Sequence, residues 1–171
     1  PGHPLITAAR RGSTLSLCQQ RFTYLDMPCD QRWLIPLGLI IWKSGGQVEI
    51  RSELMDDFKK DLELPDDTLA YKINSTQTGF YRVAYADTEN LNKLGELIQA
   101  KKMAAVDRWG IQNDLYAQVR KGGLPLRDYI DFLEHYTTER DFLPLISIAG
   151  HLLQAWHLTT GSQQAAVTAK G

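Results

Sequence analysis

Histidine is the residue type in this chain best suited to metal or acid–base chemistry, and its four copies are His3, His135, His151 and His157. A hydrolytic zinc site on a helix needs two His one turn apart, a Glu between them as general base and a later Glu as third ligand. No His-Glu-x-x-His occurs, and His151 and His157 are six positions apart, which would separate them by about 120° around a helix. We therefore predict no catalytic, metal-binding or cofactor-binding residue in this chain.

Nucleophilic and phosphate-binding motifs are also missing. The sequence holds no Gly-x-x-x-x-Gly-Lys loop and no Gly-x-Ser-x-Gly elbow. Cys18 and Cys29 have no His near them in sequence, and two cysteines are too few for a disulfide framework or a structural metal site. We expect both thiols to be reduced, in a cytoplasmic protein.

The first half of the chain alternates apolar and polar residues, which predicts β-strands. Pro36 implies an edge, a bulge or a strand start, and Val48, Ile50 and Leu54 are predicted to face inward. Short strands separated by turn residues are typical of a β-sandwich. The expected strands cover residues 4–8, 14–23, 33–42, 47–54 and 56–67.

After Asp87 the apolar period changes from two to 3.6, which predicts helices. The fourth helix begins near Asp141, tolerates Pro144 in its first turn, and carries a set of apolar residues. They are Leu145, Ile148, Ala149, Leu152, Leu153 and Trp156. Short loops favour antiparallel neighbours, and the expected helices cover residues from Asp87 or Thr88 onward, 104–120, 126–137 and 141 onward.

Residues 71–85 join the strand-rich half to the helical half, and they define the predicted division of the chain into domains. Their pattern predicts two strands of a hairpin, with a polar turn at 74–79 in which Gly79 supplies a positive φ. We predict a sandwich domain over residues 1–86, the start of a helical domain over 87–160 and a flexible tail over 161–171.

The same segment resembles a motif of the zinc aminopeptidases (gluzincins) typified by aminopeptidase N and the tricorn-interacting factors. The matching residues are Lys72, Asn74, Gln77, Gly79, Phe80, Tyr81, Arg82, Val83 and Tyr85. The resemblance continues in five further segments: Gly2–Ile6, Gln19–Phe22, Trp33–Pro36, Asp107–Asp114 with Gly122, and Glu139–Pro144. Two residues in them depart from the family pattern. His3 stands where the family has an aromatic residue, and Ile111 stands where Leu is usual. It implies a β-plus-α fold, a β-sandwich followed by the first antiparallel helical hairpins of an α-superhelical domain.

The resemblance also implies a function for the parent protein and a limited role for this chain. The parent would use zinc to remove N-terminal residues from peptides, and this chain, without the catalytic motif, would be inactive alone. It would act as a spacer and as a wall of the peptide cavity. Its partners would be the catalytic domain and the remaining helices of the same polypeptide, with peptide as the parent's substrate.

Four charged residues are candidates for contacts in that cavity or between domains: Arg82, Asp107, Arg108 and Asp114. Asp107 and Asp114 are seven positions apart and so share a helix face. A helix-terminal ion-pair network that ties the helix to the sandwich explains the three charges of the helix equally well, and a buried structural pair explains Arg82; we prefer these interpretations.

Charge and length exclude other functions. The formal net charge is −1 with interspersed signs, which argues against nucleic-acid or anionic-membrane binding, and no apolar run is long enough to span a bilayer. The start at Pro1 without Met suggests a piece of a longer protein, whose cut helical array would self-associate. The alternative is a free-standing protein-interaction module without peptidase activity.

Overall fold

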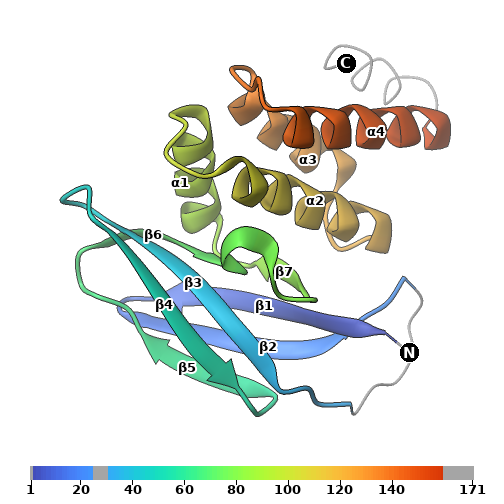
Figure 1. Cartoon of the computed structure of the whole chain (residues 1–171). Coiled ribbons are helices and arrows are strands. Elements are labelled where there is room, and N and C mark those ends of the chain that lie inside the picture. Colours follow the sequence, from blue (N-terminus) through green and yellow to red (C-terminus); the bar gives the residue numbers. More distant parts are fainter. Residues whose placement is uncertain (1, 25–30, 160–171) are drawn as a thin grey trace. The chain divides into compact units, whose positions relative to one another are not determined.

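The computed structural model describes residues 2–24 and 31–159, and in them two β-sheets are followed by four α-helices (Figure 1). The predicted β-plus-α fold is therefore confirmed. The predicted thiol of Cys29 and the predicted tail at 161–171 lie outside the described residues. The chain divides into two compact units, Pro1–Leu94 and Gly95–Gly171, and each is described by itself.

The first sheet has the strand order β5-β2-β1-β7. Strands β1 (His3–Arg11) and β2 (Thr14–Phe22) form an antiparallel hairpin, which turns at Gly12 with φ 62°. Strand β5 (Lys59–Glu63) pairs with β2 as the predicted edge strand. Strand β7 (Arg82–Tyr85) pairs in parallel with β1 at the other edge.

The second sheet has the order β4-β3-β6. Strand β3 (Ile35–Lys43) is central, and Pro36 is its second residue, so the prediction of a strand start is correct. Strand β4 (Val48–Met55) follows β3 through the Ser44–Gly46 turn, and β6 (Thr68–Ile73) pairs with the other side of β3. The inward faces of both sheets form one apolar core, which includes Ile6, Leu15, Leu17, Leu37, Leu39, Ile41, Met55 and Tyr71.

The prediction that Val48, Ile50 and Leu54 face inward is wrong. Their side chains are 53%, 74% and 50% exposed, and the opposite face of β4 carries Glu49, Arg51, Glu53 and Met55. Met55 pairs with Ile35 of β3 and faces the core. Because side chains alternate between the two faces of a strand, Val48, Ile50 and Leu54 then point to the opposite, exposed face. The inward charges are paired, for example Arg51 with Glu49 at 2.7 Å.

The prediction of a hairpin over residues 71–85 is half right. The structure contains both strands, but β6 belongs to the second sheet and β7 to the first, so the segment crosses between sheets. The turn between them holds a short 3₁₀ helix, Ser75–Gln77. Gly79 does not supply the positive φ, which occurs instead at Asn74, Thr76 and Gln77.

The helices lie close to the predicted ranges. They are α1 (Thr88–Gln99), α2 (Ala105–Lys121), α3 (Leu126–Phe132), continued by the 3₁₀ turn Leu133–Tyr136, and α4 (Phe142–Leu158). Gly122 ends α2 in the left-handed conformation, as a C-terminal cap does. Among the described helices, none is both long and apolar enough to cross a bilayer.

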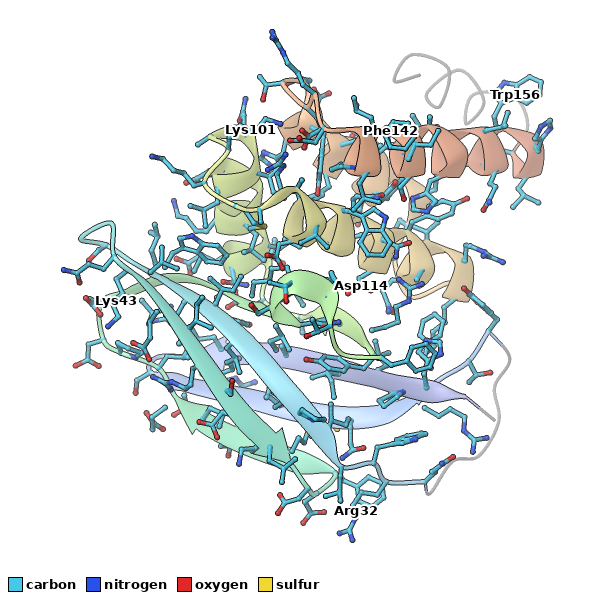
Figure 2. The ribbon with its side chains drawn as sticks, viewed as in Figure 1. Arg32, Lys43, Lys101, Asp114, Phe142 and Trp156 are labelled. Carbon is cyan, nitrogen blue, oxygen red and sulfur yellow. The ribbon has the colours of Figure 1, made fainter. Side chains whose placement is uncertain are left out.

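The apolar residues predicted for α4 lie on two different faces of the helix. The buried residues of the helix are Pro144, Leu152 and Ala155. A second stripe at heptad spacing (Phe142, Ile146, Ala149, Leu153 and Trp156) is exposed, and Figure 2 labels its two ends, Phe142 and Trp156. A helix that is apolar on opposite faces is typical of the interior of a larger helical array.

Candidate functional site

The turn between β6 and β7 is organised by the side chain of Asn74, which is 2% exposed. Its Oδ1 accepts the Gly79 N–H at 2.8 Å, and its Nδ2 donates to the Gly79 carbonyl at 3.0 Å. Nδ2 also lies 3.2 Å from Oε1 of Gln77. Asn is among the few residue types that adopt positive φ readily, and here φ is 64°. The amide therefore holds the turn closed from inside.

Position 79 requires glycine because a side chain there would clash with its surroundings, and not because of its φ. A Cβ built there would lie 2.1 Å from Cε1 of the Tyr81 ring, far closer than real contacts. Tyr81 is 6% exposed and belongs to the sandwich core. The Gly-Phe-Tyr part of the segment thus lets the chain pass over the Tyr81 ring at close range.

Lys72 is a charged side chain with no exposed surface, on β6. Its Nζ donates to the carbonyls of Asn74 at 2.7 Å and Ile73 at 3.2 Å. The Ile73 N–H donates to the hydroxyl of Tyr85 at 3.0 Å. Residues of the 71–85 motif therefore bind one another's backbone and stabilise the crossing between the sheets.

The free edge of β6 is covered by Asn90 in the first turn of α1. The Asn90 amide accepts the Tyr71 N–H at 2.8 Å and donates to the Tyr71 carbonyl at 3.0 Å. Asp87 in turn accepts the Asn90 N–H at 3.1 Å. This side chain replaces a neighbouring strand, and an edge covered in this way is blocked from pairing with another chain.

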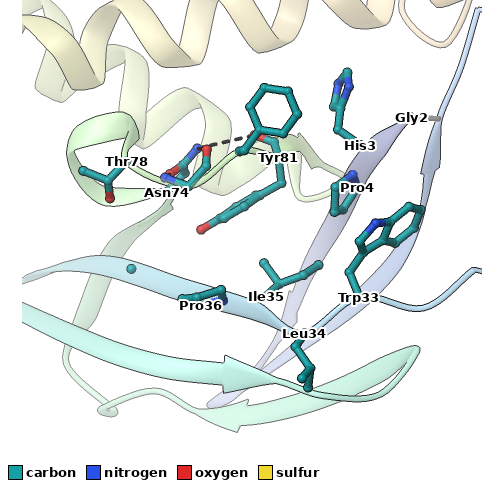
Figure 3. Close-up of a pocket in the computed structure, with 13 residues that line it drawn as sticks. Gly2, His3, Pro4, Trp33, Leu34, Ile35, Pro36, Asn74, Thr78 and Tyr81 are labelled. Carbon is teal, nitrogen blue, oxygen red and sulfur yellow. Dashed lines mark hydrogen bonds between the residues drawn. The ribbon is translucent and has the colours of Figure 1, made fainter.

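A hollow of about 390 Å³ opens beside this turn, at the N-terminal end of β1 (Figure 3). Its walls come from three stretches of the first unit: the start of β1, the approach to β3 and the turn before β7. They include His3, Trp33, Leu34, Pro36, Phe80 and Tyr81. No Asp, Glu, Lys or Arg is among the described residues that line it.

The surroundings of the hollow keep it apolar. Burial lowers the pKa of His3, and the charge of Arg82 lowers it further, so the imidazole is neutral near pH 7. His3 stacks on Phe22 with ring centroids 5.1 Å apart and meets Phe80 edge-on at 5.5 Å. Phe80 and Leu34 on the rim are 85% and 72% exposed, so two large apolar side chains meet solvent beside the hollow.

In the second unit, Arg108 of α2 is the centre of a buried ion network. Its guanidinium donates to both carboxylate oxygens of Glu139, at 2.6 and 2.9 Å, and also to Asp141. The Met103 carbonyl accepts from Nη1 at 2.5 Å, and the Tyr136 hydroxyl donates to the Arg108 carbonyl at 2.6 Å. Bidentate pairs of this kind fix both distance and orientation.

Glu139 connects this network to the start of α4. Burial on its own would raise the pKa of Glu139, but hydrogen bonds from Arg108 and Lys101 outweigh it and hold the pKa well below its usual range. The hydrogen bond to Glu139 in turn raises the pKa of Arg108. Oε1 also accepts the N–H groups of Arg140 and Asp141, just ahead of α4. The network therefore joins α2 to α4 with every charge paired.

The four predicted site residues lie in two units. Arg82 is the half-buried first residue of β7, opposite Leu5 of β1. Asp107 and Asp114 are 2% and 4% exposed on α2, and Asp114 is labelled in Figure 2. The ion pairs found for Arg108, with Glu139 and Asp141, lie within the helical unit and differ from the predicted link between helix and sandwich. A contact of any of the four residues with peptide stays a prediction.

Sequence analysis missed the partners of Arg108 and a second polar cluster. Tyr129 and His151 both meet Oε1 of Gln112, at 3.1 and 3.0 Å, and Nε2 of Gln112 donates to Ser147 at 2.9 Å. Tyr116 stacks on His151 at 4.1 Å. Polar residues on an otherwise apolar helix face were the available signal, but their partners lie 17 to 39 positions away.

No group of three or more His, Cys, Asp or Glu in the described part of the chain is placed to hold a metal ion. The zinc implied for the parent enzyme therefore does not fit the described residues. The arrangement found here is one of rigid connections and an apolar hollow.

Comparison with known proteins places these features in a family. The family model for the ERAP1-like C-terminal domain matches residues 70–169, so it begins on β6 and covers the turn, β7 and the helices. The matched residues are more than half of the chain.

Curated relatives match along nearly the whole chain. Tricorn protease-interacting factor F2 of Thermoplasma acidophilum is 30% identical over 170 residues, which cover 99% of this chain and 20% of the relative. The F2 factor of Thermoplasma volcanium is 31% identical over 163 residues, and a leucyl aminopeptidase of Saccharolobus solfataricus is 27% identical over 152, covering 95% and 89% of this chain. The chain spans about a fifth of the length of these relatives.

Proposed function

We propose that this chain, which belongs to the M1 aminopeptidase family, forms the non-catalytic sandwich and first C-terminal helices of a zinc-dependent aminopeptidase. In that protein it spaces the helical domain from the catalytic domain and forms part of the wall of the peptide cavity. Zinc and the catalytic residues are supplied by the rest of the parent. The partners of this chain are the catalytic domain and the remaining helices of the same polypeptide.

One observation carries this proposal: the similarity runs unbroken through the 71–85 segment. The family match begins at residue 70, and the F2 factor of Thermoplasma acidophilum matches both the sandwich and the helices. A module shuffled between unrelated proteins would instead be matched in one unit alone. The buried bonds of Asn74, Lys72 and Asn90 give the sandwich side the rigidity that a spacer needs. We also propose a cytoplasmic location, which the low cysteine number supports.

The test is to obtain the complete reading frame around the codon for Pro1 and to express its product. We expect an in-frame His-Glu-x-x-His followed by a Glu ligand, zinc-dependent release of N-terminal residues from peptides by the complete product, and none by the 171-residue chain alone. Zinc-dependent turnover of an aminoacyl amide by the 171-residue chain would contradict the proposal.

The alternative is a free-standing protein-interaction module, which the exposed apolar stripe of α4 favours. It requires a start codon directly before Pro1 and no upstream coding sequence in frame. The same sequencing experiment therefore separates the two functions.

A further inference from the structure

A polar hollow of about 350 Å³ opens on the first unit, away from the 74–79 turn. Its walls come from the turn between β1 and β2, the start of β6 and the first turns of α1. Two basic residues, Arg10 and Lys93, and two acidic residues, Asp87 and Glu89, line it. The volume lies in the range of small-molecule sites, about 300–1,000 Å³.

Arg10 is held in place in this hollow without being neutralised. Its Nε donates to the Gly12 carbonyl at 2.7 Å, and its Nη1 donates to the Thr68 carbonyl at 2.8 Å. Both acceptors are uncharged, and no carboxylate in the described part of the chain pairs with this guanidinium. A guanidinium has five N–H donors and binds carboxylates well, so the remaining nitrogen, Nη2, is available to a ligand.

The acidic residues of the hollow are unmatched as well. Asp87 accepts the Asn90 N–H at 3.1 Å, and Glu89 is exposed in the first turn of α1. Neither carboxylate forms an ion pair with another described residue. A structural network would pair such charges with one another, as the network of Arg108 does. The hollow instead keeps opposite charges around one space without joining them.

A buried hydroxyl near the hollow also has no partner. The Asn90 amide, which lines the hollow, holds both backbone groups of Tyr71. The Tyr71 side chain is fully buried, and its hydroxyl makes no hydrogen bond with the described residues. Burial raises the pKa of this hydroxyl, Asp87 raises it further and Arg10 lowers it, so the hydroxyl is directed to the end of the sandwich where these charges lie. A buried polar group without a partner calls for an explanation, and a polar ligand at this end supplies one.

We propose that this hollow binds a small zwitterion of the α-amino acid class, with its carboxylate at Arg10 and its ammonium group at Asp87 and Glu89. A simple anion would lie beside two unmatched carboxylates, and a simple cation beside Arg10 and Lys93, and like charges brought together in this way disfavour binding. Leu69, which is 40% exposed, offers an apolar wall to an aliphatic side chain of the ligand. The inference goes beyond the proposed function and does not depend on it.

Isothermal titration calorimetry of the 171-residue chain with L-leucine tests the proposal. Two analogues each remove one charge: N-acetyl-L-leucine lacks the ammonium group, and L-leucine amide lacks the carboxylate. We expect saturable binding of L-leucine at millimolar concentration or below. Each analogue should bind at least about tenfold more weakly, because it leaves one sign of lining charge unmatched. Equal affinity for L-leucine and either analogue would overturn the proposal, as would the absence of L-leucine binding.

Two variants locate the ligand. Arg10→Gln removes the guanidinium, and Glu89→Gln removes an exposed charge that makes no contact needed for folding. Both should weaken L-leucine binding at least about fivefold. Asp128→Asn, which changes an exposed acidic residue in the first turn of α3, is the matched control and should bind like the wild type. If Glu89→Gln binds L-leucine as tightly as the wild type, the ligand lies elsewhere and the proposal fails, whether or not Arg10→Gln folds.

Discussion

Buried side-chain amides of the sandwich bind backbone groups as donor and acceptor at once. Gln19 pairs with the N–H and carbonyl of Trp33, Asn90 with those of Tyr71, and Asn74 with those of Gly79. Each amide thus satisfies a backbone segment that no strand reaches. Leaving one such group unpaired in the interior costs more than the bond itself contributes.

The first prediction concerns Asn90. Asn90→Asp keeps the acceptor for the Tyr71 N–H but turns a carboxylate oxygen toward the Tyr71 carbonyl in a buried position. We expect the free energy of unfolding, measured by urea denaturation at pH 7, to fall by about 2–3 kcal/mol. Asn92→Asp, two residues along α1 and exposed, is the control and should have little effect. Similar losses for both variants would mean that the amide pairing contributes nothing.

The second prediction concerns Glu139. Glu139→Gln leaves the Arg108 charge buried without a full counter-charge, and we expect a loss of about 3 kcal/mol at pH 7. Asp131→Asn, which removes an exposed ion pair with Arg127, should cost less than about 1 kcal/mol. Chemical denaturation of the three proteins gives the comparison, and equal losses would contradict a special role for the buried network.

The same residue sets a pH dependence. The pKa of Glu139 is lower in the folded than in the unfolded chain, so its contribution to stability is complete above the unfolded value, near 4.5, and is lost as pH falls toward the folded value. As the pH is lowered below about 4.5, we expect the urea midpoint of the wild type to fall more steeply than the midpoint of Glu139→Gln. Parallel curves for the two proteins would show that Glu139 is not the group responsible.

At the scale of elements, α1 and the turn after α3 meet at Gly95. A Cβ there would lie 2.3 Å from Cδ2 of the His135 ring. We expect Gly95→Ala to lower the free energy of unfolding by about 1–3 kcal/mol through overpacking. In a His135→Ala background the same change should raise stability by about 0.5–1 kcal/mol, because Ala favours the helix.

The control for Gly95 is Gly150 of α4, where a Cβ would meet nothing within 4 Å. Gly150→Ala should therefore be stabilising in both backgrounds when all variants are compared by thermal unfolding. If Gly95→Ala changes the free energy of unfolding in the same direction with and without the His135 ring, close packing against that ring is not the reason why Gly occupies position 95.

At the scale of the whole molecule, the exposed stripe of α4 should govern association. Ile146 and Leu153 lie seven positions apart on it and are 53% and 59% exposed. We expect the chain to self-associate at high concentration, and Ile146→Lys with Leu153→Lys to shift sedimentation toward monomer, since charges oppose burial of the stripe. Ile50→Lys, on an exposed strand of the other unit, is the matched control. A wild-type chain that stays monomeric throughout would contradict this prediction.

The amino-acid sequence by itself determined that strands come first and helices follow, the end of α2 at Gly122, the start of α4 after Asp141, and the resemblance that identified the family. These features depend on periodicity, turn residues and motifs, all of which involve residues close to one another in the sequence. Arg108 could be selected as an unusual charge, but its partners Glu139 and Asp141 could not, because contacts across 31 to 33 positions follow from helix packing.

Only the tertiary structure decided which face of each element is covered. The outward turn of Val48 and Ile50 follows from pairing register, and the crossing of β6 and β7 into different sheets follows from the parallel pairing of β7 with β1. The structure shows which apolar face of α4 is buried, at Leu152 and Ala155, and which face stays exposed, at Ile146 and Leu153. The physical reason is that periodicity shows that a face is apolar, whereas burial depends on which neighbours reach it.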